Sequence, residues 1–206
     1  MRVVFSYQKF SGEYGLFGHF TRRNSTWAPL AQALLAAVCE EAGHEAIILD
    51  GEANQWDTKR MAKEVIKLNP DIVGISAYSP FFHLSADLAA AIKRINKDIP
   101  IMVGGPHITI MKEKALLPQF DYGFMGEAED SLPEFLEYLS GDKHSSPTHI
   151  KGMLWRDLTR RVVNNGERWL TPNAMKKTDL GYNYPLDRIP LPARHLLPMY
   201  KYKLGT

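Results

Sequence analysis

Small and polar residues follow several hydrophobic runs of this sequence, at positions where a chain can bind a ligand. Hydroxyl groups follow one run, and they can both donate and accept hydrogen bonds. Two glycines follow another, where the lack of a Cβ lets a ligand approach the backbone closely. The candidate binding residues of these two segments are Ser76, Tyr78, Ser79, Gly104, Gly105, Pro106 and His107.

Two further segments have unusual composition. Residues 7–26 are rich in glycine and aromatics and are far longer than the two to six residues usual between a strand and a helix. Such long loops are often functional, so Gly15, Leu16 and Phe17 are candidates there. The segment Gly126-Glu127-Ala128-Glu129 follows another hydrophobic run, where its carboxylates can accept hydrogen bonds from hydroxyl or amide groups of a ligand. Gly126 and Glu127 are the candidates there.

Each segment also has a purely structural interpretation. Residues 7–26 can form a surface loop, 76–80 can cap a helix, and Gly104 with Gly105 can make a tight turn. His107 can be a solvated loop residue. Glu127 can favour a helix N-terminus through the helix dipole. Residue types alone leave these alternatives open.

Several common chemistries lack their patterns in this sequence. There is no G-x-x-x-x-G-K-[ST] segment and no G-x-G-x-x-G after the first hydrophobic run. No paired-cysteine or H-x-x-x-H pattern indicates zinc, so we expect no metal ligands and assign no catalytic residue. Cys39 is the only cysteine, which excludes an internal disulfide and favours a reducing, cytoplasmic location. We expect Cys39 to be a small core residue of a helix.

Composition narrows the class of protein. Hydrophobic residues make up 45% of the 206 residues, enough for a real core. Lys and Arg number 25 against 23 acidic residues, a balance that does not indicate a nucleic-acid partner. No stretch approaches roughly 18 uninterrupted apolar residues, so we expect no membrane span.

Hydrophobic runs alternate with helical periodicity over residues 1–142. The predicted strands are 3–6, 46–49, 72–76, 100–103 and 122–125, and the predicted helices are 27–42, 57–68, 84–96, 109–115 and 131–140. This alternation predicts an α/β fold with a doubly wound, flavodoxin-like (Rossmann-like) parallel sheet of five strands in the order 2-1-3-4-5. Ligands of such sheets bind beyond the carboxyl ends of the strands.

The character of the chain changes after residue 142. Residues 143–148 are polar, and 153–155 and 161–163 predict short strands with a turn signal at 164–166. Residues 179–198 carry four prolines and no helical period, which predicts an extended strap without a core of its own. We therefore divide the chain into a domain of residues 1–142 and a linker of residues 143–206 that carries a C-terminal β-hairpin.

Five segments, in order, resemble one family. They are 29–45 (P-L entering a helix, then AGHE), 70–76 (PD-x-VG-x-S), 103–109 (VGGPH-x-T), 121–129 (D-x-x-x-x-GE-x-E) and 187–194. This pattern resembles the N-terminal cobalamin (B12)-binding domain of cobalamin-dependent radical S-adenosylmethionine (radical SAM) proteins. The resemblance covers essentially the whole chain.

The resemblance implies a role for the candidate residues. The nucleotide tail of cobalamin would enter a slot lined by Ser76 and by Gly104 and Gly105, and the loop around Gly15–Phe17 would cover the corrin. Mutases of the wider fold place D-x-H-x-x-G after the first strand, whereas residues 6–11 here read SYQKFS. The resemblance therefore implies base-off cobalamin without a protein histidine on cobalt.

The resemblance also implies a longer protein. The C-x-x-x-C-x-x-C motif that binds a 4Fe-4S cluster is absent, so the cluster and SAM would belong to a domain beyond residue 206. We expect a cofactor module that is no catalyst alone. Its full-length enzyme would perform methyl transfer or a related radical reaction, such as that of magnesium-protoporphyrin monomethyl ester cyclase. Its partners would be cobalamin and its own radical SAM domain. The alternative is a flavodoxin-like binding or protein-interaction domain that has lost cobalamin.

Overall fold

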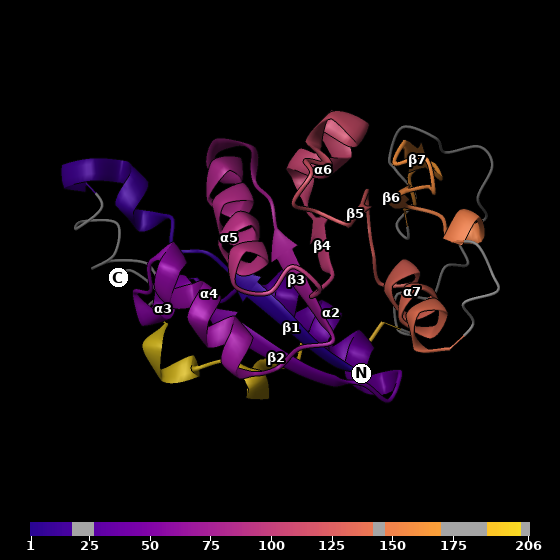
Figure 1. Cartoon of the computed structure of the whole chain (residues 1–206). Helices are drawn as coiled ribbons and strands as arrows, with labels where there is room; N and C mark the ends of the chain where they lie inside the picture. The colour runs from indigo at the N-terminus through magenta and orange to yellow at the C-terminus, as the bar shows by residue number, and fades with distance from the viewer. Residues whose placement is uncertain (18–26, 142–146, 170–188, 203–206) are drawn as a thin grey trace, which may run out of the picture.

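The computed structural model describes residues 1–17, 27–141, 147–169 and 189–202, and Figure 1 shows a single twisted sheet with helices around it. The sheet has seven strands in the order β2-β1-β3-β4-β5-β6-β7. The strands are β1 (Arg2–Tyr7), β2 (Glu45–Asp50), β3 (Ile72–Ser76), β4 (Ile101–Gly104), β5 (Tyr122–Phe124), β6 (Met153–Arg156) and β7 (Val162–Asn164).

The strands β1 to β5 are parallel, and their order confirms the predicted 2-1-3-4-5. The five predicted parallel strands and the predicted C-terminal hairpin are both present, but the sheet has seven strands, because the hairpin β6–β7 pairs antiparallel with β5 and extends it. Pairing with β6 covers the edge of β5, whose free backbone groups would otherwise be exposed. The predicted domain boundary falls at residues 142–146, outside the described residues.

The five predicted helices are present close to their predicted positions, and the described residues also contain short helical segments that were not predicted. The helical segments are η1 (Ser11–Phe17), α2 (Leu30–Glu41), α3 (Gly51–Asn54), α4 (Thr58–Lys67), η2 (Ser79–Phe81), α5 (Phe82–Ile95), α6 (Pro106–Met111), η3 (Lys112–Ala115), α7 (Ser131–Ser140), η4 (Pro147–His149), η6 (Arg194–Leu196) and η7 (Met199–Lys201). Asp57 caps α4, where its carboxylate accepts a hydrogen bond from the Arg60 backbone N–H at 2.7 Å. α2 begins three residues later than predicted, because a residue before proline avoids the helical region and Pro29 itself has a non-helical ψ of 76°.

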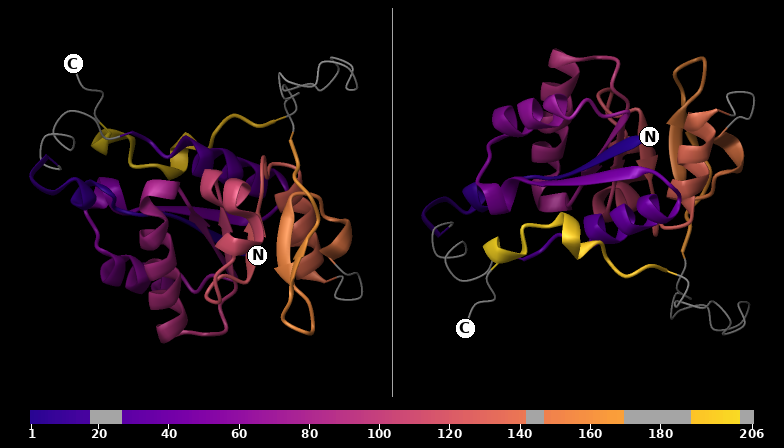
Figure 2. Two further views of the ribbon diagram at one scale, coloured as in Figure 1. Left: turned by 90° about the horizontal axis from the view of Figure 1, so that it is seen from above. Right: turned by 90° about the horizontal axis from the view of Figure 1, so that it is seen from below.

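Two hydrophobic layers cover the sheet, one on each face. On one face Met61 and Val65 of α4 and Leu88 of α5 pack on β-strand residues such as Val73. On the other face α2, α7 and the segment 189–202 pack on Val3, Phe5 and their neighbours. Figure 2 shows this segment, in yellow, on the opposite side of the sheet from α5. This arrangement follows from right-handed crossovers that run in opposite directions from β1.

The segment 189–202, which we call the C-terminal strap, packs along α2. The Ala193 backbone N–H donates to the carbonyl of Ala33 at 2.8 Å. Leu197 is buried in the α2 layer, and the Tyr202 hydroxyl donates to Asp50 at 2.8 Å. The strap therefore uses the core of the sheet domain and ends beside the carboxyl end of β2. Residues 179–188 of the predicted strap lie outside the described residues. No helix within the described residues is both long and apolar enough to cross a membrane.

Candidate functional site

The carboxyl ends of the parallel strands form one edge of the sheet, and strand order reverses there between β1 and β3. Ligands of doubly wound sheets bind at such a reversal. A cavity of about 310 Å³ opens at this edge, between α2 and the start of α7. Its volume is near the lower end of the range for small-molecule sites, roughly 300–1,000 Å³, so it is too small for a whole macrocycle.

Small residues form the floor of this cavity. Ser76, Gly104 and Phe124 are direct neighbours across β3, β4 and β5. One row below, Gly74 lies between Phe5 and Met102. All six of these residues line the cavity. The hollow exists because Ser76 and Gly104 have little or no side chain where a parallel strand normally carries a large apolar one, whereas the Phe5 and Met102 side chains fill the space over Gly74.

A strained turn holds the rim of the cavity. Gly105 has a φ of 111°, and a Cβ at this position would lie 2.8 Å from the carbonyl oxygen of Ala77. The turn is closed by the Ala77 backbone N–H, which donates to the carbonyl of Gly104 at 2.8 Å. Only glycine combines this backbone conformation with this close approach. The tight-turn interpretation of Gly105 is therefore confirmed, and Gly104 is free of the same constraint.

Gln32 of α2 is the buried polar residue of the cavity wall. It is 3% exposed, lines the cavity, and its Nε2 donates a hydrogen bond to Ser76 Oγ. Its Oε1 is buried and has no hydrogen-bond partner among the described residues. A buried amide oxygen without a partner costs about 1–3 kcal/mol, so Gln32 is a residue that a ligand can satisfy.

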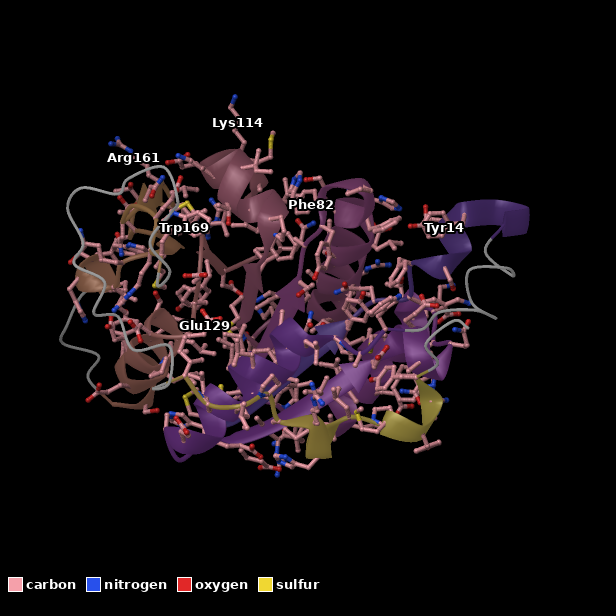
Figure 3. The ribbon with its side chains drawn as sticks, turned by 180° about the vertical axis from the view of Figure 1, so that it is seen from behind. Tyr14, Phe82, Lys114, Glu129, Arg161 and Trp169 are labelled. Atoms are coloured by element: carbon pink, nitrogen blue, oxygen red, sulfur yellow. The ribbon has the colours of Figure 1, made fainter. Side chains whose placement is uncertain are left out.

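Glu129 lies on the other side of the cavity, in the segment between β5 and α7. Burial raises the pKa of its carboxyl group above the usual range. Its Oε2 is also buried without a partner among the described residues. Figure 3 labels Glu129, with Trp169 of the segment after the hairpin on the same side of the molecule.

Arg168 holds the segment that carries Glu127 and Glu129. The Glu127 backbone N–H donates to the Arg168 carbonyl at 2.8 Å. The Arg168 guanidinium pairs with Asp130 at 3.3 Å and with Glu134 of α7 at 3.0 Å. Arg168, which follows the hairpin in the chain, therefore holds the segment that forms one rim of the cavity.

The structure brings seven of the twelve candidate residues to this cavity, and three described candidates, Gly15, Ser79 and His107, are not among its lining residues. The seven that line it are Ser76, Tyr78, Gly104, Gly105, Pro106, Gly126 and Glu127. Gly15 is exposed in η1 and is not among the lining residues. The side chains of Leu16 and Phe17 lie outside the described part of the chain.

Ser79 and His107 form a pair of their own outside the cavity lining. His107 Nδ1 lies 3.1 Å from Ser79 Oγ, and its ring stacks on Phe82 with centroids 4.0 Å apart. Partial burial lowers the pKa of His107 below its ordinary value. These two contacts hold the His107 ring against η2 and the start of α5.

Aromatic side chains join η1 to the loop after β3 at the same edge of the sheet. Phe10 stacks on Phe81 with centroids 5.4 Å apart, and Tyr14 contacts both rings edge-on. Glu13 adds a contact of 3.1 Å to His83. Figure 3 labels Tyr14 at the opposite end of the molecule from Glu129 and Trp169. The first loop is therefore anchored beside β3 in its described part.

Sequence reasoning missed most of the apolar and polar wall. The missed lining residues are Phe5, Ala31, Gln32, Leu35, Gly74, Ile75, Met102, Val103, Phe124 and Leu132. Gly74 carried a usable signal, since a glycine inside an apolar strand indicates a close approach. Gln32 carried a weaker one, as a polar residue on the apolar face of a helix.

Cys39 is fully buried in the α2 layer, as predicted for a core residue. Burial raises the pKa of its thiol to about 12. Among the residues that the structure describes, no three His, Cys, Asp or Glu side chains are grouped as a metal site would require.

Comparison with known families bears on this cavity. The family model of the B12 binding domain matches residues 20–136. This range contains every described element from α2 to β5 and the first half of α7. The chain belongs to the B12-binding domain family. The glycine and serine floor of the cavity lies entirely within the matched range.

Two curated relatives of this B12-binding domain are larger enzymes. The uncharacterized methyltransferase PH0819 of Pyrococcus horikoshii is 33% identical over 181 residues, which cover 87% of this chain and 36% of that protein. The anaerobic magnesium-protoporphyrin IX monomethyl ester cyclase of Rubrivivax gelatinosus is 29% identical over 136 residues, covering 64% of this chain and 23% of that protein. The chain thus spans about a third or less of their length.

A solved structure shares the fold. The radical S-adenosylmethionine methyltransferase TsrM from Kitasatospora setae, with cobalamin and a [4Fe-4S] cluster bound, superimposes with a TM-score of 0.63 at 20% identity. The match covers 86% of this chain and 30% of TsrM. At this identity the likeness concerns the fold of the B12-binding domain.

Proposed function

We propose that this chain is the cobalamin-binding module of a cobalamin-dependent radical SAM enzyme, whose complete reaction is a methyl transfer or a related radical reaction. The observation that carries the proposal is the coincidence of the B12-binding family match over 20–136 with the cavity floored by Gly74, Ser76 and Gly104. The relatives that span this chain are named as a methyltransferase and a cyclase, which supports the reaction class.

The residues present fit cobalamin in its two parts. The cavity has room for the nucleotide tail, and its buried, unpartnered Gln32 Oε1 offers that tail a hydrogen bond. The corrin would then lie over the carboxyl edge, where Tyr78 and Tyr14 are exposed aromatic side chains. Bound cobalamin would supply the cobalt-centred chemistry, while the chain supplies binding and orientation.

We further propose that the protein holds cobalamin base-off, without a histidine on cobalt. Residues 8–11, which directly follow β1, contain no histidine, and His19 further along the same loop lies outside the described residues. The histidines described at this edge are held elsewhere, His107 by Ser79 and Phe82 and His83 by Glu13. A nucleotide tail held in the cavity would not be available to supply its base to cobalt.

A binding experiment tests both proposals. The purified protein is mixed with hydroxocobalamin, free ligand is removed, and the visible spectrum is recorded. We expect retained corrin absorbance with the base-off spectrum. Protein that retains no corrin would argue against a cobalamin module, whereas a spectrum of nitrogen-ligated cobalt would contradict only the base-off proposal.

The proposed larger enzyme is tested separately by the gene. The 4Fe-4S cluster and SAM would be bound by a radical SAM domain of the same polypeptide, which would also be the principal partner of this module. We expect C-x-x-x-C-x-x-C in the reading frame shortly beyond residue 206. A reading frame without these cysteines would refute the radical SAM assignment and leave the cobalamin proposal standing.

A further inference from the structure

Unpartnered polar atoms are concentrated at the cavity. Within the described residues, four buried side-chain nitrogen or oxygen atoms have no hydrogen-bond partner: Gln8 Nε2, Gln32 Oε1, Gln55 Oε1 and Glu129 Oε2. Two of them, on Gln32 and Glu129, belong to residues that line the same cavity. Native proteins rarely leave such groups unsatisfied, and those that remain call for an explanation such as a ligand.

The hydrogen bonds of Gln32 decide what kind of group would satisfy it. Because Nε2 donates to Ser76 Oγ, the amide oxygen is the atom left over, and oxygen can only accept. Glu129 Oε2, on the other side of the cavity, is likewise an oxygen. The remaining lining is mostly apolar, including Phe5, Met102 and Leu132. An occupant that matches this cavity is a flat apolar group that carries hydrogen-bond donors.

We propose that Gln32, with Glu129, recognises hydrogen-bond donors on the nucleotide tail of the bound cobamide. The inference rests on the proposed function. The tail offers donors from two sources. The ribose hydroxyls are common to all complete cobamides, whereas an amino group occurs on an adenine lower base and not on dimethylbenzimidazole.

Three corrinoids and two substitutions separate these possibilities. The ligands are cobalamin, the adenine-containing cobamide, and cobinamide, which lacks the nucleotide tail. Gln32→Leu replaces the amide with an apolar side chain of similar size. The matched control is Gln119→Leu, because Gln119 donates to the Ala86 carbonyl on the α5 side, away from the cavity. Binding is measured by titration of the visible spectrum.

For Gln32→Leu we expect about a two- to tenfold loss of affinity for complete cobamides, the value of one net hydrogen bond, and no change for cobinamide. Equal losses for the two complete cobamides would assign the donor to the ribose. A larger loss for the adenine cobamide would assign it to the lower base. Gln119→Leu should bind all three corrinoids like the unmodified protein.

Folding of the variant is measured by its thermal unfolding without ligand. We expect little net change in stability, because loss of the hydrogen bond to Ser76 Oγ is offset by removal of a buried amide oxygen that has no partner. If Gln32→Leu does not fold, Gln32→Met serves as the length-matched apolar variant, because methionine adapts to irregular cores.

The proposal is overturned if a folded Gln32 variant binds complete cobamides as tightly as the unmodified protein. It is also overturned if the unmodified protein binds cobinamide as tightly as cobalamin, because the tail then contributes nothing. An unmodified protein that binds none of the three corrinoids would refute the proposed function itself.

Discussion

Gly104 and Gly105 are adjacent in the sequence but meet different constraints in the fold. A Cβ on Gly104 would find its nearest neighbour, Phe124 Cβ, at 3.8 Å, which is an ordinary contact. A Cβ on Gly105 would lie 2.8 Å from the Ala77 carbonyl oxygen, on a backbone with a φ of 111°. One glycine therefore leaves space for a ligand, and the other permits a turn.

We predict that Gly104→Val fills the cavity without destabilising the protein. The added methyl groups would occupy space that the nucleotide tail needs, and valine suits a strand better than glycine. We expect at least about a tenfold loss of cobalamin affinity, with an unchanged or higher midpoint of thermal unfolding. Undiminished binding by a folded Gly104→Val protein would exclude the cavity as the tail site.

We predict the opposite pattern of effects for Gly105→Ala. The strained φ and the contact with the Ala77 carbonyl should lower the free energy of unfolding by about 1–3 kcal/mol. Urea denaturation measures this loss, with Gly104→Ala as the matched control that should stay within about 0.5 kcal/mol of the unmodified protein. If both variants lost stability equally, the assigned turn geometry would be wrong.

At the scale of elements, α2 links the cavity to the C-terminal strap. Its Gln32 lines the cavity, while the neighbouring Ala33 carbonyl accepts the hydrogen bond of Ala193 from the strap. The far end of the strap is held at β2 by Tyr202 and by Lys201, whose Nζ donates to Asn54 Oδ1 at 2.5 Å. The strap thus packs against the helix that forms one wall of the site.

We predict that Tyr202→Phe destabilises the protein in a pH-dependent way. Asp50 is fully buried, and burial raises the pKa of its carboxyl while the Tyr202 hydroxyl lowers it. Removing the hydroxyl leaves a buried carboxylate with one fewer donor, which costs about 1–3 kcal/mol near pH 7.

The sign of the pH dependence follows from the raised pKa of Asp50. A folded-state pKa above the unfolded value means that stability is highest when the carboxyl is protonated and falls as pH rises. The variant raises that pKa further, so its deficit should be larger near pH 7 than below pH 3.8, the ordinary value of the group. Urea titrations at both pH values measure it. Tyr200→Phe is the control, since Tyr200 of the same strap is 83% exposed and should show no deficit.

At the scale of the whole molecule, the hairpin and the parallel sheet share one core. Leu154 of β6 is fully buried in the layer that also contains residues of α4 and α5. Arg168, four residues beyond β7, forms ion pairs with Asp130 and with Glu134 of α7. We therefore propose that residues 147–169 fold together with residues 1–141 as a single unit.

We predict that Leu154→Ala lowers the free energy of unfolding of the whole chain by about 2–5 kcal/mol. Helix content, followed by circular dichroism, and tryptophan fluorescence should shift to a lower urea midpoint together. The control is Leu158→Ala, since Leu158 is fully exposed in the turn after β6 and should leave the midpoint unchanged. If Leu154→Ala left the urea midpoint of the circular dichroism signal unchanged, the hairpin would fold independently of the sheet.

The sequence by itself determined the parallel sheet, its strand order and the loops at its carboxyl edge. These features follow from local patterns, because a buried parallel strand is continuously apolar and a crossover has one hand. Ser76 and Gly104 were predicted to share a slot, and the register of β3 and β4 places them side by side. For Gly105 the sequence left both a ligand contact and a tight turn open, and its φ of 111° shows that the backbone there favours glycine.

Only the tertiary structure decided what surrounds that slot. Gln32 precedes Ser76 by 44 positions, and no local pattern connects the two. The same holds for the hairpin, whose sequence predicts two strands but not the edge of β5 that they join. Such contacts depend on how helices and strands distant in sequence pack against each other. The periodicity of each element reports which of its faces is buried, but not the neighbour that buries it.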